Sequence, residues 1–132
     1  MSDFDRFVDI ETRKRPSGIG EEVIQHLVYT YGARYREILK YGEEDPDRNL
    51  PVSHGGRVIQ AEVLHGIRRE MAQTLGDIVF RRTELGTAGH PGEACLERCA
   101  GILQRELGWD RSRAHREIDA VEAVFSERSA LQ

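Results

Sequence analysis

Apolar residues in this chain of 132 residues recur at intervals of three and four, and no stretch of alternating apolar and polar residues competes convincingly with that pattern. Such a period places apolar side chains on one face of a helix, whereas a half-buried strand needs a period of two. Glycines follow several of these stripes, as they commonly do at helix ends. The pattern therefore predicts an all-α fold, a compact bundle of five or six helices without a sheet.

The ends of the predicted helices carry local signals. Ser17 and Asp110 are predicted N-caps, because their side-chain oxygens accept hydrogen bonds from the first free backbone amides. Thr74 with Asp77 resembles a capping box in which Asp takes the place of Glu. Glycines are the predicted stops. The predicted helices cover, by residue number, 17–31, 33–41, 57–71, 74–82, 95–107 and 110–125, with Gly32, Gly42 and Gly108 as stops and with loops at 43–56 and 86–92.

The length of the chain fits one ordinary domain. Residues 1–16 have no clear period and run into Arg13-Lys14-Arg15-Pro16, so we expect an N-terminal linker or short arm, with room for a strand or a helical turn. Residues 17–128 are the predicted helical domain, and residues 129–132 are a predicted tail.

Composition narrows the class of protein. A net charge of −4 with a pI near 5.7 gives no general attraction to nucleic acid or to an anionic membrane. The longest apolar runs span only a few residues, and the first residues are acidic, so we expect no membrane insertion and no secretory signal. Two cysteines cannot build a disulfide scaffold. These features favour a soluble cytoplasmic protein.

Three patterns that could carry chemistry fail on their context. Gly18-Ile19-Gly20 lacks the preceding strand and the third glycine of a dinucleotide site. Cys95 and Cys99 lie one helical turn apart without a second ligand pair at zinc-finger spacing. Glu62 and His65 are spaced like one half of a di-iron element, but the second copy is absent. We therefore expect no catalytic, cofactor-binding or metal-ligating residue in this chain, and a surface or half-buried His65.

One segment differs in charge from the rest of the chain. Five arginines oppose three acidic residues between Arg57 and Arg82, which gives this segment a net charge of +2, whereas the remainder carries −6. Guanidinium groups here are suited to carboxylates on a partner surface. A solvated helix face with local ion pairs explains the same composition equally well.

Four segments, in this order, resemble a known family. They are His26-Leu27-Val28-Tyr29-Thr30-Tyr31-Gly32, then Ala61-Glu62-Val63-Leu64-His65-Gly66-Ile67-Arg68-Arg69-Glu70-Met71-Ala72, then Thr74-Leu75-Gly76-Asp77-Ile78-Val79-Phe80-Arg81-Arg82-Thr83, and finally Glu106-Leu107-Gly108-Trp109-Asp110. The set resembles the C-terminal domain of FAD-dependent glycerol-3-phosphate dehydrogenases and alpha-glycerophosphate oxidases. The resemblance covers roughly residues 20–125, and its most specific part is Glu-Met-Ala followed by Asp and Arg-Arg-Thr.

The resemblance implies a helical cap whose full enzyme oxidises sn-glycerol 3-phosphate to dihydroxyacetone phosphate through FAD. The preceding domain of such an enzyme holds the flavin, so we expect the isolated chain to be inactive. Its implied partner is that flavin-binding domain, in the same chain or as a separate subunit, and contact with the inner membrane would arise only through the full enzyme. The implied inter-domain or substrate-rim residues are Glu70, Asp77, Arg81, Arg82 and Thr83.

Two roles fit the Asp77 and Arg81-Arg82-Thr83 stretch: a brace between domains, or the rim of the substrate entrance, where arginine suits a phosphate. Asp77 with Arg81, four residues on, also has the spacing of a simple helix ion pair.

Two alternatives to the dehydrogenase hypothesis remain open. The first is a helical adaptor or regulator that binds another protein. A small ligand-binding or metal-dependent enzyme is the weakest alternative. If a missing domain normally covers apolar surface of this chain, that exposed surface would permit the isolated chain to form a homodimer.

Overall fold

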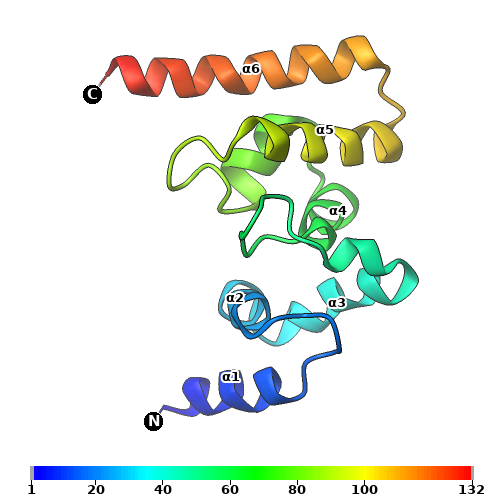
Figure 1. The fold of residues 1–132 in the computed structure, drawn as a ribbon, viewed down its shortest axis with the longest axis vertical. Helices are drawn as coiled ribbons and strands as arrows, with labels where there is room; N and C mark the ends of the chain where they lie inside the picture. The colour runs from blue at the N-terminus through cyan, green and yellow to red at the C-terminus, as the bar shows by residue number, and fades with distance from the viewer. Residues whose placement is uncertain (1, 132) are drawn as a thin grey trace.

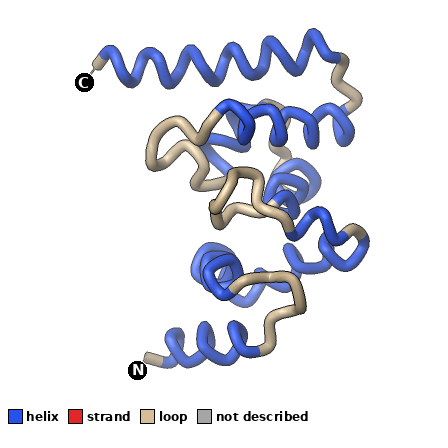
Figure 2. The backbone as a smooth tube through the Cα atoms, viewed as in Figure 1, coloured by secondary structure: helices blue, strands red, loops and turns tan. Residues whose placement is uncertain are grey.

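Six α-helices stack in chain order along the long axis of the molecule, from α1 at one end to α6 at the other (Figure 1). The computed structural model describes residues 2–131, and within them there is no β-strand (Figure 2). The all-α prediction is therefore confirmed. The elements are α1 (Asp3–Arg13), α2 (Glu21–Tyr31), the 3-10 turn η1 (Gly32–Arg34), α3 (Tyr35–Glu44), the 3-10 turn η2 (Pro46–Asn49), α4 (Gln60–Arg69), the π-helical η3 (Asp77–Arg82), α5 (Glu93–Leu107) and α6 (Arg111–Ala130).

The buried apolar side chains form two clusters that meet at α4. The first cluster joins α1, α2 and α3 to the start of α4, where Ile59 and Ala61 are fully buried. The second joins the rest of α4 to η3, α5 and α6. Tyr41 of α3 packs against both clusters. Because α4 contributes to both clusters, it positions the groups that lie on either side of it.

Helix α1 is more regular than the arm expected for residues 1–16. Val8 is buried in the first cluster, but polar residues complete the buried face of this helix. The Thr12 hydroxyl donates to the Val8 carbonyl at 2.6 Å, and the buried Glu11 pairs with Arg36 of α3. A pattern of apolar residues alone does not detect such a face. The boundaries of the helical domain at residues 17 and 128 stay a prediction.

Several predicted helix ends are confirmed, whereas the end signals read at Ser17 and Gly42 are wrong, and α4 starts at Gln60 rather than 57 and α6 runs on to Ala130 rather than ending at 125. Gly32 and Gly108 follow α2 and α5 with positive φ angles of 62° and 72°. Ser17 does not cap α2, which starts at Glu21 after Gly20. Gly42 does not stop α3, which continues to Glu44. A Cβ at residue 42 would meet the Asn49 side chain of η2, so this glycine permits close packing rather than a helix end.

Helix α6 begins as the sequence predicts. The Asp110 carboxylate accepts a hydrogen bond from the Arg113 backbone amide at 2.7 Å. None of the helices within residues 2–131 has the length and apolar composition needed to span a membrane.

Asp110→Ala is expected to lower the free energy of unfolding by about 1 kcal/mol, because the first turn of α6 loses its side-chain cap. Urea denaturation followed by circular dichroism measures this change. Asp110→Asn keeps an oxygen acceptor and is the control. An Asn variant as unstable as the Ala variant would assign the effect to charge rather than to capping.

Candidate functional site

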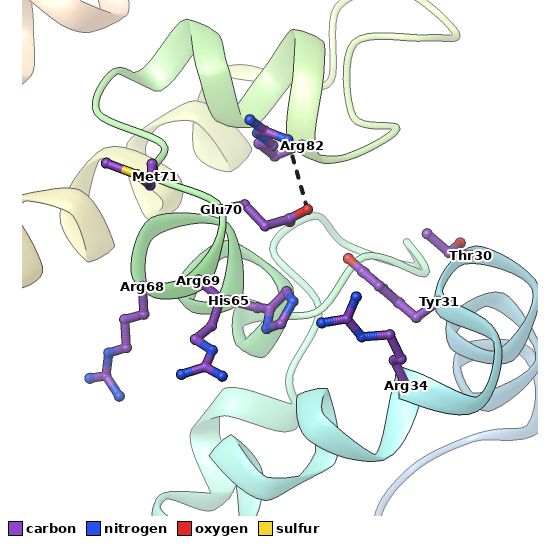
Figure 3. A pocket seen from close by; sticks show the side chains of 9 residues that line it. All are labelled: Thr30, Tyr31, Arg34, His65, Arg68, Arg69, Glu70, Met71 and Arg82. Carbon is purple, nitrogen blue, oxygen red and sulfur yellow. Dashed lines mark ion pairs between the residues drawn. The ribbon is translucent and has the colours of Figure 1, made fainter.

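A hollow of about 800 Å³ opens where the end of α2 and η1 face the end of α4 and η3. Figure 3 shows the side chains around it, with Arg34 reaching toward His65 and Arg82 on the opposite wall. Four of its nine lining residues are arginines. The lining residues are Thr30, Tyr31, Arg34, His65, Arg68, Arg69, Glu70, Met71 and Arg82.

The four arginines differ in how firmly they are paired. Arg68 makes two hydrogen bonds to Glu106 of α5, at 2.7 and 2.9 Å. Arg82 lies 3.8 Å from the Glu70 carboxylate, and this ion pair is the dashed line in Figure 3. Arg34 lies 3.8 Å from Glu37, which belongs to α3. Within the described residues, Arg69 has no ion pair. Three guanidinium groups at this hollow therefore lack a hydrogen-bonded carboxylate.

A buried polar network lies beneath the hollow, around Glu62 of α4. Only 1% of Glu62 is exposed, and its carboxylate accepts hydrogen bonds from His26 Nε2 at 2.9 Å and from the Tyr31 hydroxyl at 3.0 Å. It also accepts the Ile59 backbone amide at 2.8 Å, which closes the first turn of α4. Such partners are what a buried carboxylate requires, since burial without them is costly. The network ties α2 to α4.

The neighbouring charges set the protonation of the two α2 residues. Burial lowers the pKa of His26, but the hydrogen bond to Glu62 and the charges of Glu62 and Glu84 outweigh it, so the net pKa is raised. Burial and the Glu62 carboxylate raise the pKa of Tyr31 far above its usual value, and the hydroxyl remains a donor. His26 Nδ1 lies 3.3 Å from the Thr30 hydroxyl. This arrangement favours a protonated His26 paired with Glu62.

His65 is buried rather than at the surface, and it forms one wall of the hollow. Its ring packs edge-on against Tyr31 and Tyr41, with centroids at 5.9 and 6.1 Å. Burial lowers its pKa and so favours the neutral ring. Glu62 bonds to His26 and not to His65. The described residues hold no cluster of three metal-ligating side chains. Glu62 and His65 are spaced like half of a di-iron element, but their side chains contact different partners.

Met71 stands out at the rim of the hollow. Its φ of 60° is the only positive value among the described residues other than glycine, and 78% of its surface is exposed. The residue after it is fixed, because the Ala72 amide donates to the Gly66 carbonyl at 2.9 Å and Ala72 itself is buried. A non-glycine residue in this region costs about 1–2 kcal/mol. A strained backbone conformation therefore holds the apolar Met71 side chain in solvent.

The sequence-predicted site residues do not gather in one place. Glu70 and Arg82 lie together in the hollow, and Arg81 is exposed. Asp77 and Thr83 bond to backbone instead: Asp77 accepts the Gln73 and Thr74 amides at 3.0 and 3.2 Å, and the Thr83 hydroxyl donates to the Ile78 carbonyl at 2.7 Å.

The capping role predicted for Thr74 and Asp77 is confirmed, because the Asp77 amide donates in turn to the Thr74 hydroxyl at 3.0 Å. The backbone hydrogen bond from Gln73 is the largest influence that lowers the pKa of Asp77. The helix ion pair considered for Asp77 and Arg81 does not form within 4 Å in the described chain. The Asp77 carboxylate thus holds the backbone at Gln73 and Thr74, just after Met71.

Sequence reasoning missed His26, Tyr31 and Arg34 as parts of the site. His26 and Glu62 are separated by 36 positions, and no local spacing relates them. Cys95 and Cys99 are free and buried in the second cluster, where they pack as small apolar residues.

Comparison with known proteins gives a consistent set of similarities. Residues 5–114, from within α1 to the start of α6, match the family model described as the C-terminal domain of alpha-glycerophosphate oxidase. Mitochondrial glycerol-3-phosphate dehydrogenase of Bos taurus is 35% identical over 107 residues, which are 77% of this chain and 15% of that protein. The glycerol-3-phosphate dehydrogenase of Mycobacterium leprae is 29% identical over 96 residues, or 72% of this chain and 16% of that protein. No solved structure matches.

Proposed function

This chain belongs to the family of C-terminal domains of alpha-glycerophosphate oxidase and glycerol-3-phosphate dehydrogenase, and we propose that it is a non-catalytic helical domain that packs on the flavin-binding domain of such an enzyme. The chain spans about 15% of the length of the curated relatives that it matches. The oxidation of sn-glycerol 3-phosphate to dihydroxyacetone phosphate therefore belongs, in this proposal, to the rest of the enzyme.

FAD is assigned to the rest of the enzyme for a structural reason. A dinucleotide site of the common type needs a strand, a glycine-rich turn and a helix, with the pyrophosphate at the start of that helix. Residues 2–131 contain no strand, and the glycines at 18 and 20 precede α2 in a turn. The residues described here do not fit that group, so we assign none of them a step in flavin chemistry.

The strained and exposed Met71 carries the docking proposal. Strained backbone persists where the surrounding structure enforces it, and it concentrates at functional positions. An exposed apolar side chain beside arginines matches the composition of interface centres, in which Met and Arg are enriched. Glu70 precedes Met71 in sequence, Arg82 lines the same hollow, and Arg81 is the exposed neighbour of Arg82. We therefore place the contact with the flavin domain on this face, with Asp77 and Thr83 supporting its backbone.

Replacing Arg81 and Arg82 together with Ala is expected to weaken docking about tenfold, because two guanidinium groups are removed from the contact. The measurement is titration of the chain into the same enzyme's flavoprotein lacking its C-terminal domain. Circular dichroism should show an unchanged fold, since neither side chain is buried.

Arg111→Ala with Arg116→Ala is the matched control, because it removes the same charge from exposed positions of α6. Binding that is unchanged by the Arg81 and Arg82 substitutions would refute the docking face. Absence of any binding by the unaltered chain would favour an adaptor for another protein.

In this proposal, the cellular location of the chain is that of the full enzyme to which it belongs. We propose a cytoplasmic location, with contact to the inner membrane only through the full enzyme. The name of the Bos taurus relative places that protein in mitochondria, whereas the Mycobacterium leprae name gives no compartment.

A further inference from the structure

The arginine-lined hollow has more hydrogen-bond donors than its own acceptors use. Each guanidinium carries five N–H donors. Arg34 and Arg82 approach carboxylates only to 3.8 Å, which is beyond hydrogen-bond length, and Arg69 has no ion pair within the described residues. Arg68 is not counted among the free donors, because it forms a bidentate hydrogen-bonded pair with Glu106.

The free donors come from separate elements that line the same hollow. Arg34 extends from η1, Arg69 from the last turn of α4, and Arg82 from η3. Figure 3 shows the Arg34 guanidinium reaching toward the His65 ring, with the Tyr31 side chain beside it. One guanidinium suffices for the two oxygens of a planar carboxylate. Donors supplied from several directions suit a tetrahedral group with three or four charged oxygens.

We propose that this hollow binds the phosphate group of a small phosphate monoester, held by Arg34, Arg69 and Arg82 beside His65. The proposal goes beyond docking on a flavin domain, and it is tested on the chain alone. The hollow is large enough for more than the phosphate, since its volume is about 800 Å³. The single carboxylate in the lining, Glu70, opposes an anion and limits its affinity.

The experiment is a calorimetric titration of the full 132-residue chain with inorganic phosphate and with sn-glycerol 3-phosphate at constant ionic strength. Glycerol and acetate are the matched probes without phosphate. Binding of both phosphate compounds, with no binding of glycerol or acetate, supports the proposal. Equal binding of acetate and phosphate would overturn it, because any small anion would then suffice. Absence of phosphate binding would also overturn it.

Arg34→Gln and Arg69→Gln are each expected to weaken phosphate binding about tenfold, which is the effect of losing one charge-assisted hydrogen-bonding group. Arg105→Gln, an exposed arginine of α5 outside the hollow, removes the same charge and should leave the affinity unchanged. Equal weakening by all three variants would indicate a general charge effect and refute the site.

Glu70→Gln provides a readout of opposite sign. Removing the one carboxylate of the hollow should strengthen phosphate binding about threefold, because a like charge no longer opposes the anion. Weaker binding by this variant would contradict the placement of the phosphate. These titrations contain no flavoprotein, so their failure is distinct from a failure of docking.

Discussion

Glu62→Ala is expected to lower the free energy of unfolding by about 4 kcal/mol, the largest effect of any single substitution considered for this chain. Removing one member of a buried, hydrogen-bonded charge pair costs about 3–5 kcal/mol, because the remaining groups stay buried without partners. Here the change leaves His26, the Tyr31 hydroxyl and the Ile59 amide without their acceptor. Urea denaturation measures the difference. Glu97→Ala, on the exposed face of α5, is the control and should change stability by less than about 0.5 kcal/mol.

The same network predicts a dependence of stability on pH. The pKa of His26 is raised in the folded chain above its usual 6.5, so the stabilisation from this group is fully present below pH 6.5. It is lost as the pH rises through the folded pKa. Unfolding measured between pH 6 and pH 9 should show this loss in the unaltered chain and not in Glu62→Ala. The role given to Glu62 would be contradicted if Glu62→Ala lowered the free energy of unfolding by less than about 1 kcal/mol. It would also be contradicted if Glu62→Ala had the same pH profile as the unaltered chain.

Met71→Gly is expected to weaken docking on the flavin domain about 30-fold while leaving the isolated chain as stable as before or more stable. A central apolar anchor contributes about 2 kcal/mol or more to an interface. Glycine adopts a φ of 60° without the steric cost that methionine carries, which offsets its larger loss of freedom on folding. Binding titrations and urea denaturation of the same variant give the two numbers.

Met71→Ala and Leu50→Ala separate the possible causes. Alanine at residue 71 removes the anchor but keeps the strain, so docking should weaken as in Met71→Gly without a gain in stability. Leu50 is also exposed, at 52%, but lies away from the hollow, and its removal should not affect docking. Docking that survives both substitutions at residue 71 would leave the strained turn without a function at this interface.

Local signals in the sequence predicted those parts of the structure that depend on neighbours within a turn. Asp110 caps α6, Gly108 ends α5, and Thr74 with Asp77 forms the expected reciprocal cap. Each of these contacts joins residues at most four positions apart, so spacing alone places the partners. Where the local signal misled, as at Gly42, a distant contact with the η2 turn decided the outcome.

The sequence also reveals the family resemblance, because motifs in a fixed order can be recognised without knowing any tertiary contact. It drew attention to Glu70, Arg81 and Arg82, and it left the buried partners of Glu62 unseen. His65 was expected at or near the surface, since a lone histidine on a helix carries no sign of what packs over it. In the structure Tyr31 and Tyr41 cover its ring.

The sequence by itself determined the helical class, most of the helix ends and the family, because periodicity, capping and motifs act over short separations along the chain. Only the tertiary structure decided that His26 meets Glu62 across 36 residues, that arginines of η1, α4 and η3 surround one hollow, and that Met71 is held outward. The physical reason is that these contacts depend on how the helices pack: α2 shares a buried cluster with the start of α4, and η3 packs against α4. A one-dimensional pattern contains no distance between helices, and so it cannot specify which polar groups become buried together.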